Sequence, residues 1–296
     1  MHPARHRPWR GPEARKSSDV RKRSPGTDDD GAQPNGQHER QFITSLHRGL
    51  EVLRAFRPDD RAGLSNGDLA ERTGLPNSTV SRLTYTLLTT GYLNYDAVTG
   101  RYRMGVPVLS LGYACLSSMP LRDTAQTYMQ TLADACGEGI MVALGSRDER
   151  TMTYFACARS RSVVALQLGV GSRISLARSA MGRAWLAGCS ATEREALMAD
   201  LEAHTQPRTT WPAIRAGIED AVKQVAQQGY YANHGEWQAG VNAVAVPLRS
   251  TDPDLPLLGL NLGGPSHYLP ADRLPEVGKR LVELATTLSQ RMTANF

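Results

Sequence analysis

A cluster of small polar side chains and one arginine occurs in "GLPNSTVSRL", residues 74–83. Side chains of these types form hydrogen bonds with base edges and phosphates in nucleic acids. One polar residue is enough to cap the first turn of a helix, and this cluster holds several more. We therefore predict that one helix face contacts DNA through Asn77, Ser78, Thr79, Ser81 and Arg82.

The sequence around this cluster predicts two short helices separated by a tight turn. Upstream, Ser65 and Asp68 stand three residues apart, as in a capping box, and that segment ends at Gly74. Downstream, apolar residues recur at helical spacing and would bury the face opposite the polar cluster. This layout is typical of a helix-turn-helix, whose second helix enters the major groove of DNA.

A β-hairpin is predicted directly after the second helix. Residues 92–95 and 101–104 are rich in aromatic and β-forming residues, and Thr99 and Gly100 form a turn between them. Such a hairpin is the wing of a winged helix-turn-helix, and Arg101 and Arg103 would reach phosphates. Paired helices also occur in folds that never touch DNA, and the hairpin favours the DNA-binding interpretation over that one.

Two further helices flank this motif. "FITSLHRGLEVLRAF" is apolar at helical spacing and predicts a first helix that ends before Pro58. "VPVLSLGYACLSS", residues 106–118, shows a second apolar stripe and predicts a helix that links the wing to the rest of the chain.

The length of 296 residues and the charge distribution predict two domains. The net charge is +5, and the whole excess lies before residue 106 because residues 106–296 hold seventeen basic and seventeen acidic side chains. We expect a disordered basic tail at 1–41, a DNA-binding domain at 42–105, a linker helix at 106–119 and an effector-binding domain at 120–296.

The C-terminal region mixes strand-like and helical segments, which predicts an α+β domain with a mostly antiparallel sheet. The expected strands are "GIMVALG", "TMTYFAC", "SVVALQLG", "VNAVAVPL" and "LLGLNLGG". The expected helices cover residues 121–136, 179–188, 192–203, 212–228 and 271–291. Thr192 and Glu195 are expected to form a capping box.

Residue patterns for catalysis or metal binding are incomplete. The "GVGSR" loop lacks the Lys-Ser/Thr of a phosphate-binding loop, and "NHGEW" is not followed by the Pro-Cys-x-x-Cys of a zinc deaminase. No Gly-x-Ser-x-Gly elbow occurs, and the four cysteines are too far apart for a zinc site. We expect a non-enzyme without metal or cofactor. Short apolar runs predict no membrane span and a cytoplasmic location.

Several segments resemble the IclR family of bacterial transcriptional regulators. These are "DLAERTGLPNSTVSRLTYTLLTTGYL" in the N-terminal part, and "GVGSRISLARSAMGRAWLA" and "GYYANHGEWQAGVNAVAVPL" in the C-terminal part. The resemblance implies a GAF-like effector domain that binds a small molecule, often an organic or aromatic acid. It also implies a double-stranded DNA operator as partner and assembly into homodimers or homotetramers.

Matching the effector pocket of that family onto this chain implies a set of ligand-binding residues. These are Ser179, Ala180, Met181, Gly182, Asn233, Glu236, Trp237, Val241, Asn242 and Asn261. Many members carry a cysteine where this chain has "GVNA", so the ligands of those members do not transfer to it.

Three other interpretations stay open at the level of sequence. The chain could be an architectural DNA-binding protein without an effector, although its neutral C-terminal region would then have no role. It could be an enzyme with an appended DNA-binding module, which would show turnover. It could also use the two helices to bind a protein, which predicts no salt-dependent affinity for DNA.

Overall fold

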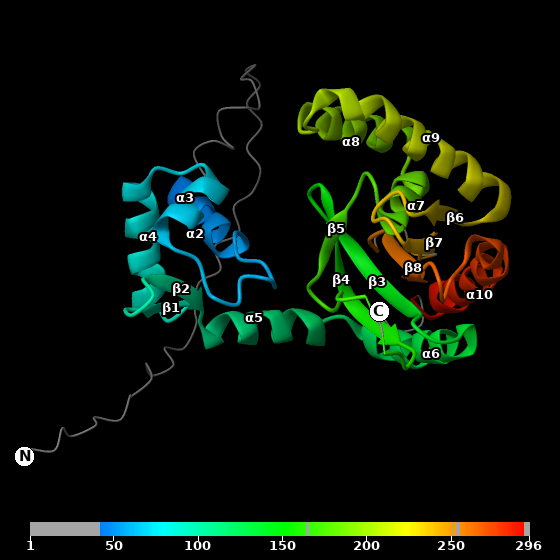
Figure 1. The fold of residues 1–296 in the computed structure, drawn as a ribbon, viewed down its shortest axis with the longest axis horizontal. Coiled ribbons are helices and arrows are strands. Elements are labelled where there is room, and N and C mark those ends of the chain that lie inside the picture. The colour runs from blue at the N-terminus through cyan, green and yellow to red at the C-terminus, as the bar shows by residue number, and fades with distance from the viewer. Residues whose placement is uncertain (1–41, 164–165, 251, 253–254, 293–296) are drawn as a thin grey trace, which may run out of the picture. The chain divides into compact units, whose positions relative to one another are not determined.

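The structure is a computed structural model that describes residues 42–163, 166–250, 252 and 255–292. The expected tail, residues 1–41, lies outside the described residues. Figure 1 shows the described elements as an N-terminal group of short helices with a hairpin, the single helix α5, and a C-terminal group around a larger sheet. The expected α+β organisation with an N-terminal winged helix-turn-helix is confirmed.

The N-terminal group contains the expected helix pair and a helix before it. Its elements are α2 (Thr44–Arg54), α3 (Asn66–Thr73), α4 (Asn77–Thr89), β1 (Leu93–Asp96) and β2 (Arg101–Met104). They share a small apolar core whose fully buried members are Val52, Leu64, Leu69, Val80 and Leu93.

The predicted capping box at the start of α3 is confirmed. Asp68 N donates to Ser65 Oγ at 3.1 Å, and Ser65 N donates to the Asp68 carboxylate at 2.9 Å. Gly74 ends the helix with a φ of +68°, a left-handed conformation that favours glycine. This turn sets the angle at which α4 leaves α3.

The hairpin of β1 and β2 is antiparallel and pairs Leu93 with Met104 and Asp96 with Arg101. A third segment joins its edge, because Leu64 and Tyr102 exchange two backbone hydrogen bonds of 2.9 and 2.7 Å. The wing is therefore fixed to the segment that precedes α3.

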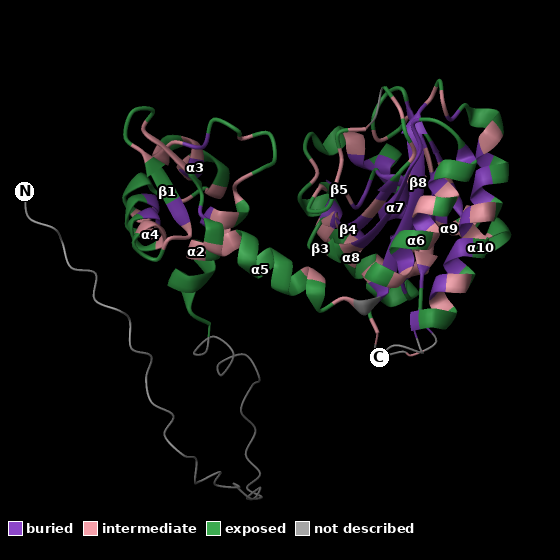
Figure 2. Cartoon of the chain, turned by 90° about the horizontal axis from the view of Figure 1, so that it is seen from below, coloured by how far each residue is buried: buried purple, intermediate pink, exposed green. Residues whose placement is uncertain are grey.

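Helix α5 (Val106–Ser117) is exposed along almost its whole length, as the green colouring in Figure 2 shows. It has no charged residue, and Val106, Leu109, Leu111 and Tyr113 are each more than half exposed. Its single cysteine, Cys115, is also exposed. Apolar helix surfaces of this size normally have a partner in solution.

The C-terminal group is built on a six-stranded antiparallel sheet with the order β5, β4, β3, β8, β7, β6. The strands are β3 (Met141–Asp148), β4 (Thr151–Arg159), β5 (Arg173–Ser175), β6 (Tyr231–His234), β7 (Val241–Leu248) and β8 (Leu258–Pro265). Strands β3 and β8, distant in sequence, are neighbours at the centre of the sheet. The expected antiparallel sheet is confirmed.

Helices cover both faces of this sheet (Figure 1). On one face, α6 (Pro120–Cys136) and α10 (Leu274–Met292) pack against the strands. On the other face, α7 (Ala180–Gly188) packs on the strands, with α8 (Ala191–Ala203) and α9 (Trp211–Gln228) outside it. Side chains alternate between faces along a strand, so Leu260 and Leu262 meet α10 while Asn261 points to the side of α7.

Three details differ from the sequence-based expectations. The described residues of "SVVALQLG" form no strand, because Leu166 and Leu168 pack into the core on the α7 side instead of pairing. Val164 and Ala165 lie outside the described residues. The short strands β5 and β6 are additions to the expected set, since "RIS" and "YANH" lack a run of β-forming residues. The capping box at Thr192 and Glu195 is wrong, because Ser190 caps α8 by accepting from Glu193 N.

Within the described residues, no helix is both long and apolar enough to cross a membrane.

Candidate DNA-contacting face and ligand cavity

The exposed face of α4 carries Ser78, Ser81, Arg82 and Tyr85, which are spaced three and four residues apart and so lie on one side of the helix. The cap residue of α4 is Pro76, and no side chain caps its first turn. The polar residues that begin α4 are thus not used as caps. Val80 and Thr84 bury the opposite face.

The predicted DNA-contacting residues of α4 are not equally available. Ser81 Oγ donates to Asn77 O at 2.9 Å, and Asn66 Nδ2 donates to Asn77 Oδ1 at 3.1 Å. Thr79 is half-buried. The side chains of Ser78 and Arg82 are exposed and form no hydrogen bond or ion pair with any described residue.

The two wing arginines also differ. Arg101 Nη1 donates to Gly63 O at 2.8 Å and lies 3.2 Å from Asp68 Oδ2, so it holds the wing to the start of α3. Arg103 lies 3.6 Å from an Asp96 carboxylate oxygen and its side chain is 53 % exposed. Arg103 is therefore the freer of the two to meet a phosphate.

A narrow cavity lies between the sheet and the start of α7 in the C-terminal domain, with about 20 Å³ of open space. Its lining is mainly apolar and includes Met141, Leu166, Leu168, Ile174, Ala180, Trp237, Val241 and Ala243. The polar lining residues are Tyr154, Ser179, Asn233 and Asn261. No charged side chain is among the described lining residues. A largely apolar wall with a few polar groups is usual for small-molecule sites.

Asn261 is the polar lining residue whose buried side-chain acceptor has no partner. Its Nδ2 donates to the Tyr154 hydroxyl at 3.3 Å, whereas its Oδ1 is buried without a partner. Asn261 is 5 % exposed, and burial raises the pKa of the Tyr154 hydroxyl, which stays protonated. A buried acceptor without a partner is costly, so Oδ1 favours a ligand that donates to it.

Ser179 and Asn233 line the same cavity with their polar atoms engaged. Ser179 Oγ donates to Ser175 O at 2.6 Å and accepts from Gly182 N at 3.0 Å, which caps α7. Asn233 Oδ1 accepts from the backbone N of residues 236 and 237, and its Nδ2 donates to Arg178 O. Both side chains thus hold the backbone segments around the cavity in place.

Glu236 does not line the cavity. Its carboxylate accepts from Arg183 Nη1 at 2.6 Å and from the Tyr231 hydroxyl at 3.2 Å. Arg183 also donates to Tyr231 OH at 2.5 Å and to Ala177 O at 3.0 Å. Burial lowers the pKa of the Arg183 guanidinium, but Tyr231 and Glu236 outweigh that effect and raise the pKa above its usual value.

Three other expected pocket residues lie away from the cavity. Met181 packs between Gly145 and Gly259 on the sheet, and Gly182 lies so close to Leu176 that a side chain there would overlap it. Asn242 points to the opposite face of the sheet from Val241, where its Nδ2 donates to Leu269 O at 2.9 Å. Strand alternation explains this difference.

The structure thus brings six of the expected residues to the cavity: Ser179, Ala180, Asn233, Trp237, Val241 and Asn261. Sequence reasoning missed Tyr154, which only strand pairing brings next to Asn261, and Tyr85, which the helical spacing of α4 could have indicated. Whether any of these residues binds a ligand or DNA stays a prediction.

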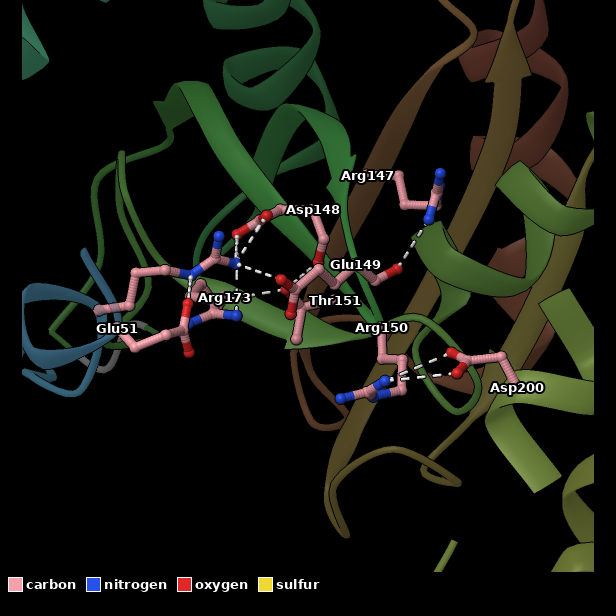
Figure 3. Close-up of polar contacts among 9 residues, drawn as sticks. Glu51, Arg147, Asp148, Glu149, Arg150, Thr151, Arg173 and Asp200 are labelled. Atoms are coloured by element: carbon pink, nitrogen blue, oxygen red, sulfur yellow. Dashed lines mark hydrogen bonds and ion pairs between the residues drawn. The ribbon is translucent and has the colours of Figure 1, made fainter. Parts of the chain in front are cut away.

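Charged side chains gather instead at the turn between β3 and β4 (Figure 3). There Arg173 lies 3.7 Å from Asp148, Arg150 reaches Asp200 at 3.4 Å, and Arg147 donates to Glu149 O. These contacts fasten β5 and α8 to the hairpin. The described residues contain no group of three or more side chains that could hold a metal ion.

Comparison with known proteins decides the family. A family model described as the bacterial transcriptional regulator IclR C-terminal domain matches residues 113–290, and an IclR helix-turn-helix domain model matches residues 45–97. The first match alone covers more than half of the chain. This chain belongs to the IclR family.

Relatives in the IclR family are transcriptional regulators rather than enzymes. The HTH-type transcriptional regulator TsaQ1/TsaQ2 of Comamonas testosteroni is 29 % identical over 256 residues, which cover 86 % of this chain and 90 % of that protein. The Pca regulon regulatory protein of Pseudomonas putida is 34 % identical over 210 residues, which cover 70 % and 69 %. This chain is accordingly a DNA-binding transcriptional regulator of the IclR type.

Solved IclR structures share its fold. The crystal structure of an IclR family transcriptional regulator from Brucella abortus matches 88 % of this chain and 96 % of its own at 38 % identity and a TM-score of 0.77. An IclR homolog from Microbacterium hydrocarbonoxydans, complexed with 4-hydroxybenzoate, matches 83 % and 99 % at 22 % identity and a TM-score of 0.60. The second likeness shows the fold alone.

Proposed function

We propose that this regulator recognises its operator through α4 and the wing, and that a small molecule in the cavity changes its affinity for that operator. The unused Asn261 Oδ1 carries the effector part of this proposal. A core without a ligand would gain nothing from an orphaned acceptor beside an apolar cavity, whereas a ligand with a donor group would satisfy it.

On the DNA side, Ser78 and Arg82 would read base edges or phosphates, with Asn77, Thr79 and Ser81 beside them. Arg103 would meet the flanking backbone, and Arg101 would contribute there less because Gly63 and Asp68 already hold it. Side-chain contacts to bases give sequence specificity, whereas contacts to phosphates set the position of the helix.

We further propose an organic or aromatic acid as the effector. No charged side chain is among the described residues that line the cavity, so a carboxylate would meet the first turn of α7. Backbone N–H groups at a helix start lack intrahelical partners and carry a partial positive charge. Ser179 and Ala180 bring that turn to the cavity, and the apolar lining suits the carbon skeleton of the acid.

The chain would act in the cytoplasm as a homodimer or homotetramer. The apolar surface of α5 supports this assembly, because a charge-free helix with exposed Leu109 and Tyr113 suits a second copy of itself better than a charged partner. Two copies of α4 would then read two half-sites related by symmetry. Such a dimer makes operator affinity depend on protein concentration.

An effector changes operator affinity only by binding the DNA-competent and DNA-incompetent arrangements with different affinity. We propose α5 as the element that carries this difference. The coupling free energy is typically about 1–3 kcal/mol, or roughly 5- to 150-fold in affinity.

The test is a titration of the protein against its own upstream DNA and a scrambled duplex at two salt concentrations. Sequence-selective binding that weakens with salt is expected, because neutralised phosphates release counterions. The same assay tests the effector class with 4-hydroxybenzoate, whose hydroxyl can donate to Asn261 Oδ1, with benzoate and succinate, which lack a donor, and with the neutral donor indole. Equal binding to both duplexes would refute operator recognition by this DNA, and a response to indole alone would refute the acid class.

A further inference from the structure

A buried cation joins two walls of the cavity. Arg183 lies on α7, whose first residues line the cavity, and its partner Glu236 lies in the loop between β6 and β7 that carries Trp237. The Arg183 side chain is 3 % exposed, while the Glu236 side chain is 46 % exposed. The contact therefore runs from the core of the domain to a loop at its surface.

The packing around Arg183 is arranged for a charge. A buried guanidinium is costly unless a carboxylate and hydrogen-bond acceptors surround it, and Glu236, Tyr231 and Ala177 O supply them. On α9, a side chain at Gly217 would overlap the guanidinium, so the absence of that side chain leaves room for the cation. These contacts fix where the Glu236 carboxylate lies.

The loop itself has a glycine in a left-handed conformation at each end. Gly235 and Gly240 have φ values of +75° and +77°, a region that residues with a side chain rarely adopt. Between them the chain has two kinds of anchor, the Glu236 carboxylate and the Asn233 Oδ1 atom that accepts from the loop backbone. The position of Glu236 therefore sets the position of its neighbour Trp237 in the cavity wall.

The cavity is small, so the position of Trp237 in its wall determines whether a ligand fits. About 20 Å³ of open space holds roughly one water molecule, whereas sites for small molecules usually enclose about 300–1,000 Å³. An acid of the proposed class enters only if a wall moves. The sheet and α7 are packed in the core, whereas two irregular segments also line the cavity, one with Leu166 and Leu168 and the other with Trp237. The second segment is the one that Arg183 holds through Glu236.

We propose that Arg183, Tyr231 and Glu236 form a latch that positions the Gly235–Gly240 loop and so controls the entry of a ligand into the cavity. This inference rests on the proposed effector-binding function. Glu236 is then an anchor of the loop and not a ligand contact. Arg183 is a positioning residue that acts through the loop.

The test measures amide hydrogen exchange by mass spectrometry on the full chain and on Glu236→Ala, Glu236→Gln and Arg183→Met. The matched control is Glu219→Ala, which removes an exposed ion pair with Arg215 on α9. In Glu236→Ala, peptides covering residues 235–240 should exchange on the order of tenfold faster, and peptides from β8 and α10 should not change. Glu236→Gln keeps an acceptor for Arg183 and should lie between that variant and the wild type.

A second readout follows Trp237 directly. The difference in fluorescence between each protein and its Trp237→Phe counterpart isolates this side chain, and acrylamide should quench it more strongly in Glu236→Ala and Arg183→Met. If Glu236→Ala does not fold, the Arg183→Met variant provides the test. This variant leaves no unpaired buried charge, because the Glu236 carboxylate is partly exposed to water. Loop exchange equal to wild type, or a rise that is uniform over the whole domain, overturns the latch. Failure of the effector proposal would appear separately, as acids that leave operator binding unchanged while loop exchange still rises.

Discussion

The exposed face of α4 and the polar lining of the cavity use similar side chains in opposite ways. On α4, the side chains of Ser78 and Arg82 have no partner among the described residues, so their polar groups are free for an external molecule. In the cavity, the side chains of Ser179 and Asn233 form hydrogen bonds with backbone groups. Among the described lining residues, Asn261 has a buried acceptor without a partner. Polar residues near a site therefore identify ligand contacts only after their internal hydrogen bonds are counted.

The largest expected effect is on the exposed face. Arg82→Ala should remove a base or phosphate contact worth about 1–3 kcal/mol in each half-site of a dimer, so specific affinity should fall by at least about 30-fold. Titration of the operator duplex measures this change, and circular dichroism checks the fold. Arg215→Ala, another exposed helical arginine, is the matched control. Wild-type affinity in Arg82→Ala would remove this arginine from the DNA-contacting face.

Asn261→Leu tests the one unused acceptor in the cavity. The effector response, expected at roughly 5- to 150-fold in the wild type, should disappear because the donor of the ligand loses its partner. The melting temperature should change little, because removal of the unsatisfied Asn261 oxygen is offset by the loss of the hydrogen bond to the buried Tyr154 hydroxyl. An unchanged response to the effector would show that Asn261 does not contact it.

Asn242→Leu makes the same chemical change on the other face of the sheet. The Leu269 carbonyl would lose its donor, so the free energy of unfolding should fall by about 1–3 kcal/mol. Urea denaturation measures this loss. The effector response should persist, because Asn242 does not line the cavity. Loss of that response without loss of stability would contradict the placement of Asn242.

The smallest effect separates two serines of α4. Ser78→Ala should lower operator affinity by about 0.5–1.5 kcal/mol in each half-site, or roughly 2- to 10-fold per half-site, because its hydroxyl has no internal partner. Ser81→Ala should cost less, since Ser81 Oγ already donates to Asn77 O. Titrations of both variants against one duplex compare them. Equal losses would mean that the internal hydrogen bond of Ser81 opens when DNA binds.

Sequence patterns were informative where a site is local and weak where it is assembled from distant segments. Ser65, Asp68 and Gly74 are local, so the α3–α4 turn could be predicted from the order of residues. In contrast, Tyr154 on β4 and Asn261 on β8 are 107 positions apart in the sequence. They meet because β3 pairs with both strands, and its pairing with β8 was not predicted. No pattern in the sequence states that pairing.

The same limit explains why Asn242 and Glu236, which were expected in the pocket, do not line the cavity. Matching a family pocket by sequence assigns adjacent residues to the pocket together. Asn242 was therefore assigned with Val241, and Glu236 with Trp237. Strand alternation sends Asn242 to the other face, and the buried Arg183 draws Glu236 away. Both effects depend on neighbours that are far away in the chain.

Cys115 gives the exposed helix α5 a natural labelling position. Among the cysteines of the described chain it is exposed, whereas Cys136 and Cys189 are buried. Cys157 is half-buried, and burial raises its thiol pKa to about 11, which leaves little reactive thiolate at neutral pH. A maleimide dye should therefore modify Cys115 first, without engineered mutations. The rate of that reaction at rising protein concentration would report whether a second copy covers the helix.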